Sequence, residues 1–95
     1  GVRVPSILQL RPNPGVRKLT GWVGVNEGTL GGGVAVFRVM DARRRKLWQS
    51  PELSVRSAPI EFQVSIEHLE GDVFLCTAGD DASVYADWLA IAALP

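Results

Sequence analysis

The chain has 95 residues, 46% of them hydrophobic, and its ten basic residues balance ten acidic ones. That length fits one domain over residues 1–95, and the apolar content argues against disorder. A neutral chain has no global field that gathers nucleic acid. The longest apolar run, Trp88 to Leu94, is far shorter than the about 20 residues that span a bilayer. We therefore expect no nucleic-acid partner and no membrane span.

Alternation of apolar and polar residues predicts strands along most of the chain. Such a period of two buries one face of a strand and exposes the other, and it is unbroken over residues 60–67. Apart from Arg38 and Asp87, residues 34–40, 73–78 and 85–94 are apolar on both faces, which is typical of central strands. Strands are predicted over residues 7–10, 18–25, 34–40, 46–49, 60–67, 73–78 and 85–94.

Turn-forming residues separate these segments. Prolines and a glycine mark residues 11–15, four glycines lie within residues 26–33, and residues 41–45 are a hairpin tip. Seven short strands at roughly ten-residue spacing, without sustained helical periodicity, predict an antiparallel β-sandwich.

The three tryptophans are candidates for sugar contacts. The C–H face of a pyranose packs on a flat aromatic ring, while its hydroxyls need fixed donors and acceptors. Large aromatic side chains also dominate cores by area, so packing inside or at the rim is the default expectation for Trp22 and Trp88. Trp48 has polar neighbours, which makes exposure a stronger alternative there.

Acidic and amide residues stand at strand ends and inside one strand. Asn26-Glu27 and Asp80-Asp81 are ordinary turn formers, but their oxygens could also accept bonds from sugar hydroxyls or ligate a structural calcium ion. Asp87 lies within an apolar strand and needs a partner. Arg38, in another apolar strand, is the candidate, and the pair requires both side chains on one face of the fold.

Catalytic chemistry has little support in the sequence. The single histidine, His68, has no clear nucleophilic partner, and the single cysteine, Cys76, lies in an apolar segment where a small core residue is expected. The basic run at residues 43–46 has no interleaved aromatic residues and is typical of a solvated turn. We expect a protein that is not an enzyme and needs no cofactor.

The order and spacing of several segments resemble the NPCBM-type domain, a family of non-catalytic modules named for carbohydrate binding and related to carbohydrate-binding module family 51. The segments are Leu19–Glu27, Phe37–Asp41, Leu47–Leu53, Gly79–Asp81 and Tyr85–Ala90. The resemblance extends from Gly1 to Leu94. It implies a jelly-roll sandwich, similar to galactose-binding domains, beside an enzyme in a larger chain. It also implies an extracellular or cell-envelope location.

The sequence departs from the family at two histidine positions. The C-terminal family motif resembles Asp-His-Ala-Asp-Trp-Ala, and here Tyr85 replaces the histidine while Ala86-Asp87-Trp88 match. Arg3 replaces a histidine near the N-terminus. These changes leave open a different sugar, weak binding, or a structural packing module without a ligand. Family members usually begin earlier, so we expect a piece that lacks N-terminal strands and exposes a sheet edge near residues 7–10.

The resemblance implies that the module binds a terminal, galactose-like sugar at loops on one edge and holds an attached enzyme near glycans. The aromatic residues would stack on the sugar, and carboxylates would accept its hydroxyls. The predicted ligand-binding residues are Trp48, Tyr85, Asp87 and Trp88, with Arg3 and Glu27 at the periphery.

Overall fold

The computed structural model describes residues 2–3, 5–26, 33–67, 69, 71–79 and 85–95. Within them lie strands and no helix. The strands are β1 (Val2–Arg3), β2 (Ser6–Leu10), β3 (Lys18–Val25), β4 (Ala35–Met40), β5 (Lys46–Gln49), β6 (Ile60–Ser65), β7 (Val73–Gly79) and β8 (Tyr85–Leu94). None of the described segments is a helix long and apolar enough to cross a membrane.

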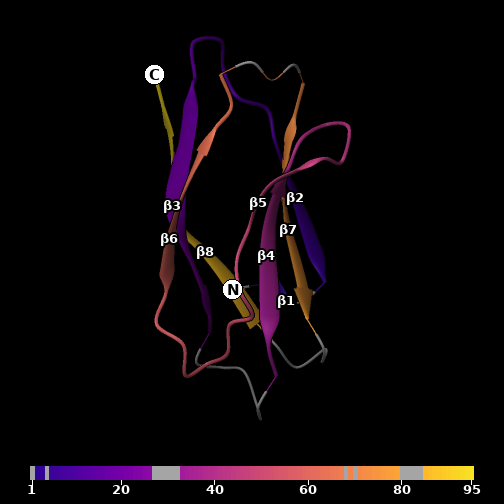
Figure 1. Ribbon diagram of the computed structural model, residues 1–95, viewed down its shortest axis with the longest axis vertical. Helices are drawn as coiled ribbons and strands as arrows, with labels where there is room; N and C mark the ends of the chain where they lie inside the picture. The colour runs from indigo at the N-terminus through magenta and orange to yellow at the C-terminus, as the bar shows by residue number, and fades with distance from the viewer. Residues whose placement is uncertain (1, 4, 27–32, 68, 70, 80–84) are drawn as a thin grey trace.

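The strands form two antiparallel sheets of four strands that pack face to face (Figure 1). The first sheet has the order β1-β8-β3-β6, and the second sheet has the order β2-β7-β4-β5. The pairs β1–β8, β2–β7, β3–β6 and β4–β5 are therefore nested, as in a long hairpin folded over itself. This connectivity is that of a jelly roll. The predicted all-β jelly-roll sandwich is confirmed.

The core lies between the sheets and is joined by aromatic contacts. Trp88 of β8 meets Phe37 of β4 and Phe62 of β6 edge to face, with ring centroids 5.3 and 5.6 Å apart. Trp48 of β5 packs on Phe62 with centroids 5.2 Å apart. The buried core consists of Leu19, Val23, Ala35, Phe37, Val39, Leu53, Phe62, Val64, Ile66, Val73, Leu75 and Ala86. Both sheets thus share one aromatic junction.

A bulge divides β8 into two halves. Leu89 pairs with Trp22 and Ala92 pairs with Thr20, so β8 has one residue more than β3 over this interval. Ala90 has a φ of 50°, a left-handed conformation that is frequent at bulges. Gly21 makes room for the change, because a Cβ there would lie 2.6 Å from Ile91 Cδ1. Ile91 therefore turns inward, whereas Leu89 stays on the outer face.

The outer face of β7 differs from expectation. Phe74 and Cys76 alternate with the buried Val73 and Leu75, and both are partly exposed. The expected core position of Cys76 is wrong, because the strand is fully buried on only one of its faces. Partial burial nevertheless raises the pKa of the Cys76 thiol. On the edge strand β2, Ile7 is 72% exposed, in line with the expected sheet edge.

Candidate functional site

A polar cluster stands on the outer face of the first sheet, where β8 begins. Asp87 lies directly opposite Gly24 of β3. Asn26, the residue after β3, donates from its Nδ2 to Asp87 Oδ2 at 3.1 Å. Its backbone N–H also donates to the Tyr85 carbonyl at 2.8 Å. Asn26 thereby joins the two strand ends and orients the carboxylate of Asp87.

The proposed pair of Asp87 with Arg38 does not form. Arg38 lies on the outer face of the second sheet, where its Nε donates to Gln49 Oε1 at 2.9 Å. Asp87 lies on the outer face of the first sheet, so the whole sandwich separates the two side chains. The hypothesis is wrong, because alternation along a strand does not say to which sheet that strand belongs.

Trp22 is the exposed aromatic residue of the same face. Its side chain is 42% exposed, and it pairs with Glu61 of β6 on one side and Leu89 of β8 on the other. Directly paired residues of antiparallel strands share a face. The indole therefore stands between an acidic and an apolar neighbour, with Asp87 two residues before Leu89. Trp22 therefore does not pack inside the core, one of the two positions, core or rim, that the default expectation allowed.

The structure does not bring the sequence-predicted residues into one site. Trp48 and Trp88 face the core. Asp87 faces outward near the start of β8, which begins at Tyr85. Adjacent residues of a strand point to opposite faces, so Asp87 and Trp88 cannot contact one ligand from the same surface. The backbone of Arg3 pairs with that of Tyr85. The side chain of Arg3 lies outside the described part of the structure, as does Glu27.

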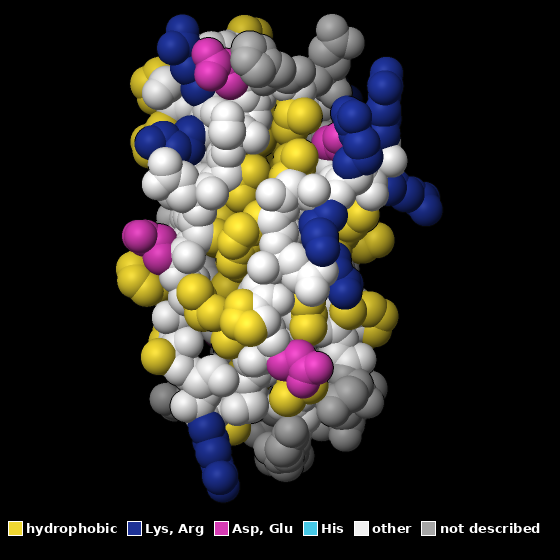
Figure 2. Space-filling model, in the orientation of Figure 1, with side chains coloured by type: hydrophobic (Ala, Val, Ile, Leu, Met, Phe, Trp, Pro, Cys, Tyr) yellow, Lys and Arg dark blue, Asp and Glu magenta, His cyan; other side chains and the backbone are white. Residues whose placement is uncertain are grey.

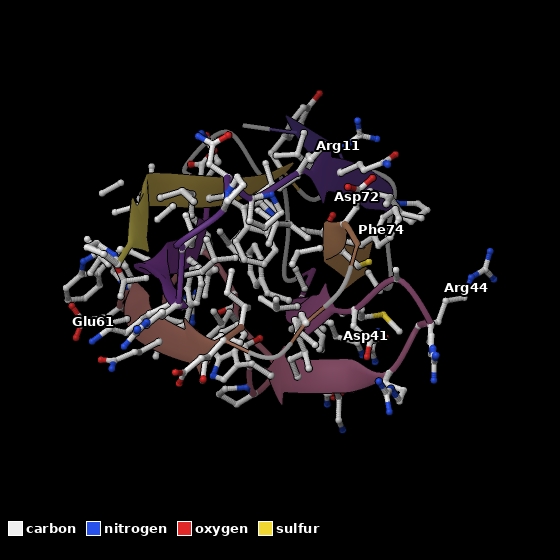
Figure 3. All side chains as sticks on the ribbon, turned by 90° about the horizontal axis from the view of Figure 1, so that it is seen from above. Arg11, Asp41, Arg44, Glu61, Asp72 and Phe74 are labelled. Atoms are coloured by element: carbon white, nitrogen blue, oxygen red, sulfur yellow. The ribbon has the colours of Figure 1, made fainter. Side chains whose placement is uncertain are left out.

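We call the surface formed by Trp22, Glu61, Asp87, Leu89 and Asn26 the Trp22 face. Figure 3 shows Glu61 pointing outward from the first sheet, on the side of the sandwich away from Phe74 and Arg44. Pro59 adds a wall, because a Cβ on Gly24 would lie 3.6 Å from its ring. The face offers a flat ring, two carboxylates and an amide, which are groups that bind hydroxylated ligands.

Metal ligands do not gather in the part of the chain that the structure describes. No three His, Cys, Asp or Glu side chains there lie close enough to hold an ion. The candidate calcium ligands Glu27, Asp80 and Asp81 fall outside that part. A calcium site at those loops stays a prediction.

The sequence matches one family model over nearly its whole length. Residues 1–93 match the model of the NPCBM/NEW2 domain. Among curated proteins, none matches the sequence. The NPCBM-type family that the motifs resemble is therefore confirmed.

Proposed function

Because the chain belongs to the NPCBM/NEW2 domain family, we propose that it is a carbohydrate-binding module that binds sugar at the Trp22 face. The family name connects the chain with carbohydrate. The observation that supports this location is an exposed indole beside a carboxylate that is already held by an amide. The module binds its sugar without cleaving it.

The Trp22 face would hold a sugar by stacking and by hydrogen bonding. One C–H face of a pyranose packs on the Trp22 ring, and Leu89, which is 44% exposed, extends the apolar surface. Glu61 and Asp87 accept hydrogen bonds from hydroxyls on either side of the ring. Diagonal neighbours on paired strands are about 7–8 Å apart, so a single sugar can contact both Trp22 and Asp87.

The pattern of side chains favours a weak site that binds one terminal sugar. We propose that this sugar is galactose-like. A shallow surface buries few atoms, so we expect a dissociation constant on the order of 10 µM to 1 mM. Linked modules would add avidity. Tyr85 would supply a hydrogen-bond donor at the position of a family histidine. The module would hold an attached secreted or cell-envelope enzyme near glycans.

Titration calorimetry against simple sugars tests this proposal. The wild-type protein is expected to bind at least one hexose saturably, and Trp22→Ala is expected to weaken that binding at least tenfold. Glu61→Gln should weaken it less. Glu67→Gln is the matched control, since Glu67 is an exposed glutamate that lies after the end of β6. Its Oε1 is 3.9 Å from Arg17 Nε. Equal losses in both glutamate variants would contradict the proposed location.

A packing module without a ligand is the rival function. It is favoured by the neighbouring exposed apolar side chains Trp22 and Leu89, which could cover an adjacent domain. The replacement of both family histidines by Arg3 and Tyr85 also favours it. The same titration separates the two functions: a folded protein that binds no member of a broad sugar panel is a packing module.

A further inference from the structure

The outer face of the second sheet is hollowed near the β4–β5 hairpin. One hollow of about 460 Å³ is lined by Ile7, Met40, Arg44 and Phe74, among others. A second hollow of about 520 Å³ lies beside Arg11 and Asp72. Both include Phe74 and Ala42, so they adjoin. We call this continuous surface the Phe74 groove.

The floor of the Phe74 groove is apolar. Ile7 of β2 pairs with Cys76 of β7, and Phe74 of β7 pairs with Met40 of β4, so four apolar side chains share the outer face. The Cys76 Sγ lies 3.9 Å from the Met40 Sδ. Such a floor suits the C–H face of a ligand better than a fully hydrated ion.

The rim of the groove is basic. Five of the ten basic residues of this neutral chain lie between Arg38 and Lys46, a segment with one acidic residue, Asp41. In Figure 2, more Lys and Arg side chains lie on the right, over the second sheet and its hairpin, than on the left, over the first sheet. In Figure 3, Arg44 extends outward from the hairpin, and Arg11 lies on the other side of Phe74. Charge is thus unevenly distributed in a chain with no net charge.

The acidic residues of the groove are already paired. Asp41 Oδ2 accepts from Arg45 Nε at 2.8 Å, and Asp72 accepts from Gln9 and from Arg11 Nε, the latter at 3.2 Å. No ion pair between described residues includes Arg43 or Arg44. The local carboxylates therefore leave both guanidinium groups able to bind an external anion.

The hairpin that carries these arginines is held in place. Asp41 Oδ1 accepts from the backbone N–H groups of Arg43 and Arg45 at 2.9 and 2.8 Å. Arg44 has a φ of 64°, and its N–H donates to the Asp41 carbonyl at 2.9 Å. A backbone fixed before binding loses less entropy when a ligand arrives.

We propose that the Phe74 groove binds a negatively charged carbohydrate chain as a second site. The carboxylate or sulfate of the sugar pairs with Arg44, which lines the groove, and with its chain neighbour Arg43 on the same hairpin. A guanidinium group can form two parallel hydrogen bonds to such an oxyanion. The C–H face of the sugar packs on Phe74 and Ile7. This inference rests on the proposed carbohydrate binding and deepens it by naming a ligand class.

Binding to three polymers with one backbone tests the inference: dextran, carboxymethyl-dextran and dextran sulfate at equal ionic strength. At least one charged polymer is expected to bind at least tenfold more tightly than dextran, and the preferred one identifies carboxylate or sulfate as the anion. The double variant Arg43→Gln/Arg44→Gln should lose at least tenfold. The matched control Arg17→Gln/Arg56→Gln removes the same charge elsewhere and should keep the affinity.

A second pair of variants tests the apolar floor. Ile7→Gln places an amide in the groove, whereas Leu8→Gln changes the other face of the same strand; these side chains are 72% and 51% exposed, so folding should survive both. Only Ile7→Gln is expected to weaken binding. If both double arginine variants weakened binding equally, or if Ile7→Gln had no effect, binding would result from general charge attraction. Either result would overturn the inference.

Further outcomes separate this inference from the proposed function. If a neutral sugar binds in a Trp22-dependent way and no charged polymer binds better than dextran, the inference fails and the proposed function stands. If no sugar or polymer binds, both fail. If poly-glutamate binds as tightly as carboxymethyl-dextran, the groove recognises acidic chains in general, and the carbohydrate assignment is overturned.

Discussion

The two outer faces of the sandwich follow the same alternation but present different chemistry. The Trp22 face combines an exposed indole with the carboxylates of Glu61 and Asp87. The Phe74 groove combines an apolar floor with Arg44 of the β4–β5 hairpin. The inward residues of both sheets must fill one core, whereas the outward residues are not bound by that requirement. A single jelly roll can therefore carry two outer surfaces of opposite character, each of which we propose as a recognition surface.

The largest effect is expected on stability, at a core residue that helps to hold together the two sheets that carry both faces. Phe62 is 2% exposed and contacts both Trp48 and Trp88. Phe62→Ala should cost about 3–5 kcal/mol of unfolding free energy, the usual range for deleting a buried aromatic side chain. Chemical denaturation measures the loss. Phe74→Ala, on the half-exposed outer face, is the control and should cost less than half as much; equal costs would contradict the shared core.

The second prediction separates the two faces by ligand. Trp22→Ala should weaken binding of a neutral sugar at least tenfold, about 1.4 kcal/mol, because the stacking surface is lost. Binding of charged dextrans should change less than twofold. Parallel titrations of both ligands with one preparation of the variant check this. Loss of both activities would mean that the faces are not independent.

The third prediction uses salt to distinguish the surfaces. Raising the salt concentration from about 0.05 M to about 0.5 M shortens the screening length severalfold. Binding of a charged polymer at the Phe74 groove should weaken at least fivefold, while neutral-sugar binding at the Trp22 face should stay nearly constant. Titrations at several salt concentrations measure both slopes. If the affinities for both ligands depended on salt concentration to the same extent, the proposed difference in chemistry between the two faces would be contradicted.

The smallest effect is expected in acid. Backbone N–H groups of the hairpin, Arg45's first among them, hold the pKa of Asp41 below its ordinary value of 3.8. Hydrogen bonds from Gln9 and Arg11 do the same for Asp72. A lowered folded-state pKa stabilises the fold above the ordinary value, and this contribution disappears as pH falls through the folded-state pKa.

Melting temperatures between pH 7 and pH 2 test this point. The wild-type protein should lose stability below about pH 4. Asp41→Asn should start from a lower melting temperature and show a flatter dependence on pH. An unchanged acid profile in this variant would show that Asp41 does not stabilise the hairpin.

The sequence alone predicted the strands well, because their pattern is local. The bounds of residues 18–25, 46–49 and 85–94 agree with β3, β5 and β8. The two-residue strand β1 was missed, because only its pairing with β8 defines it. Trp22 could have been recognised from its position opposite the apolar face of its own strand. The general tendency of large aromatic side chains to be buried outweighed that pattern in the prediction.

The arrangement of the site could not be predicted from local pattern. Asp87 and Arg38 are equivalent in sequence, each being a charged residue in an apolar strand, and the sheets that separate them are set by long-range pairing. The Phe74 groove has the same origin, since Ile7, Met40 and Phe74 come from three strands. Its residues meet only after β2, β7 and β4 have paired.

The bulge at Ala90 has a consequence for how this domain tolerates change. Before it, the odd-numbered residues of β8 point outward; after it, the even-numbered residues do, as the pairing of Ala92 with Thr20 requires. Removing Ala90 would restore simple alternation with Leu89 outward, Ile91 inward and Ala92 outward, because the bulge holds the one residue of β8 that β3 does not match. The bulge can therefore absorb the loss of one residue without turning either half of β8 over, and the outward surface at Asp87 and Leu89 stays in place.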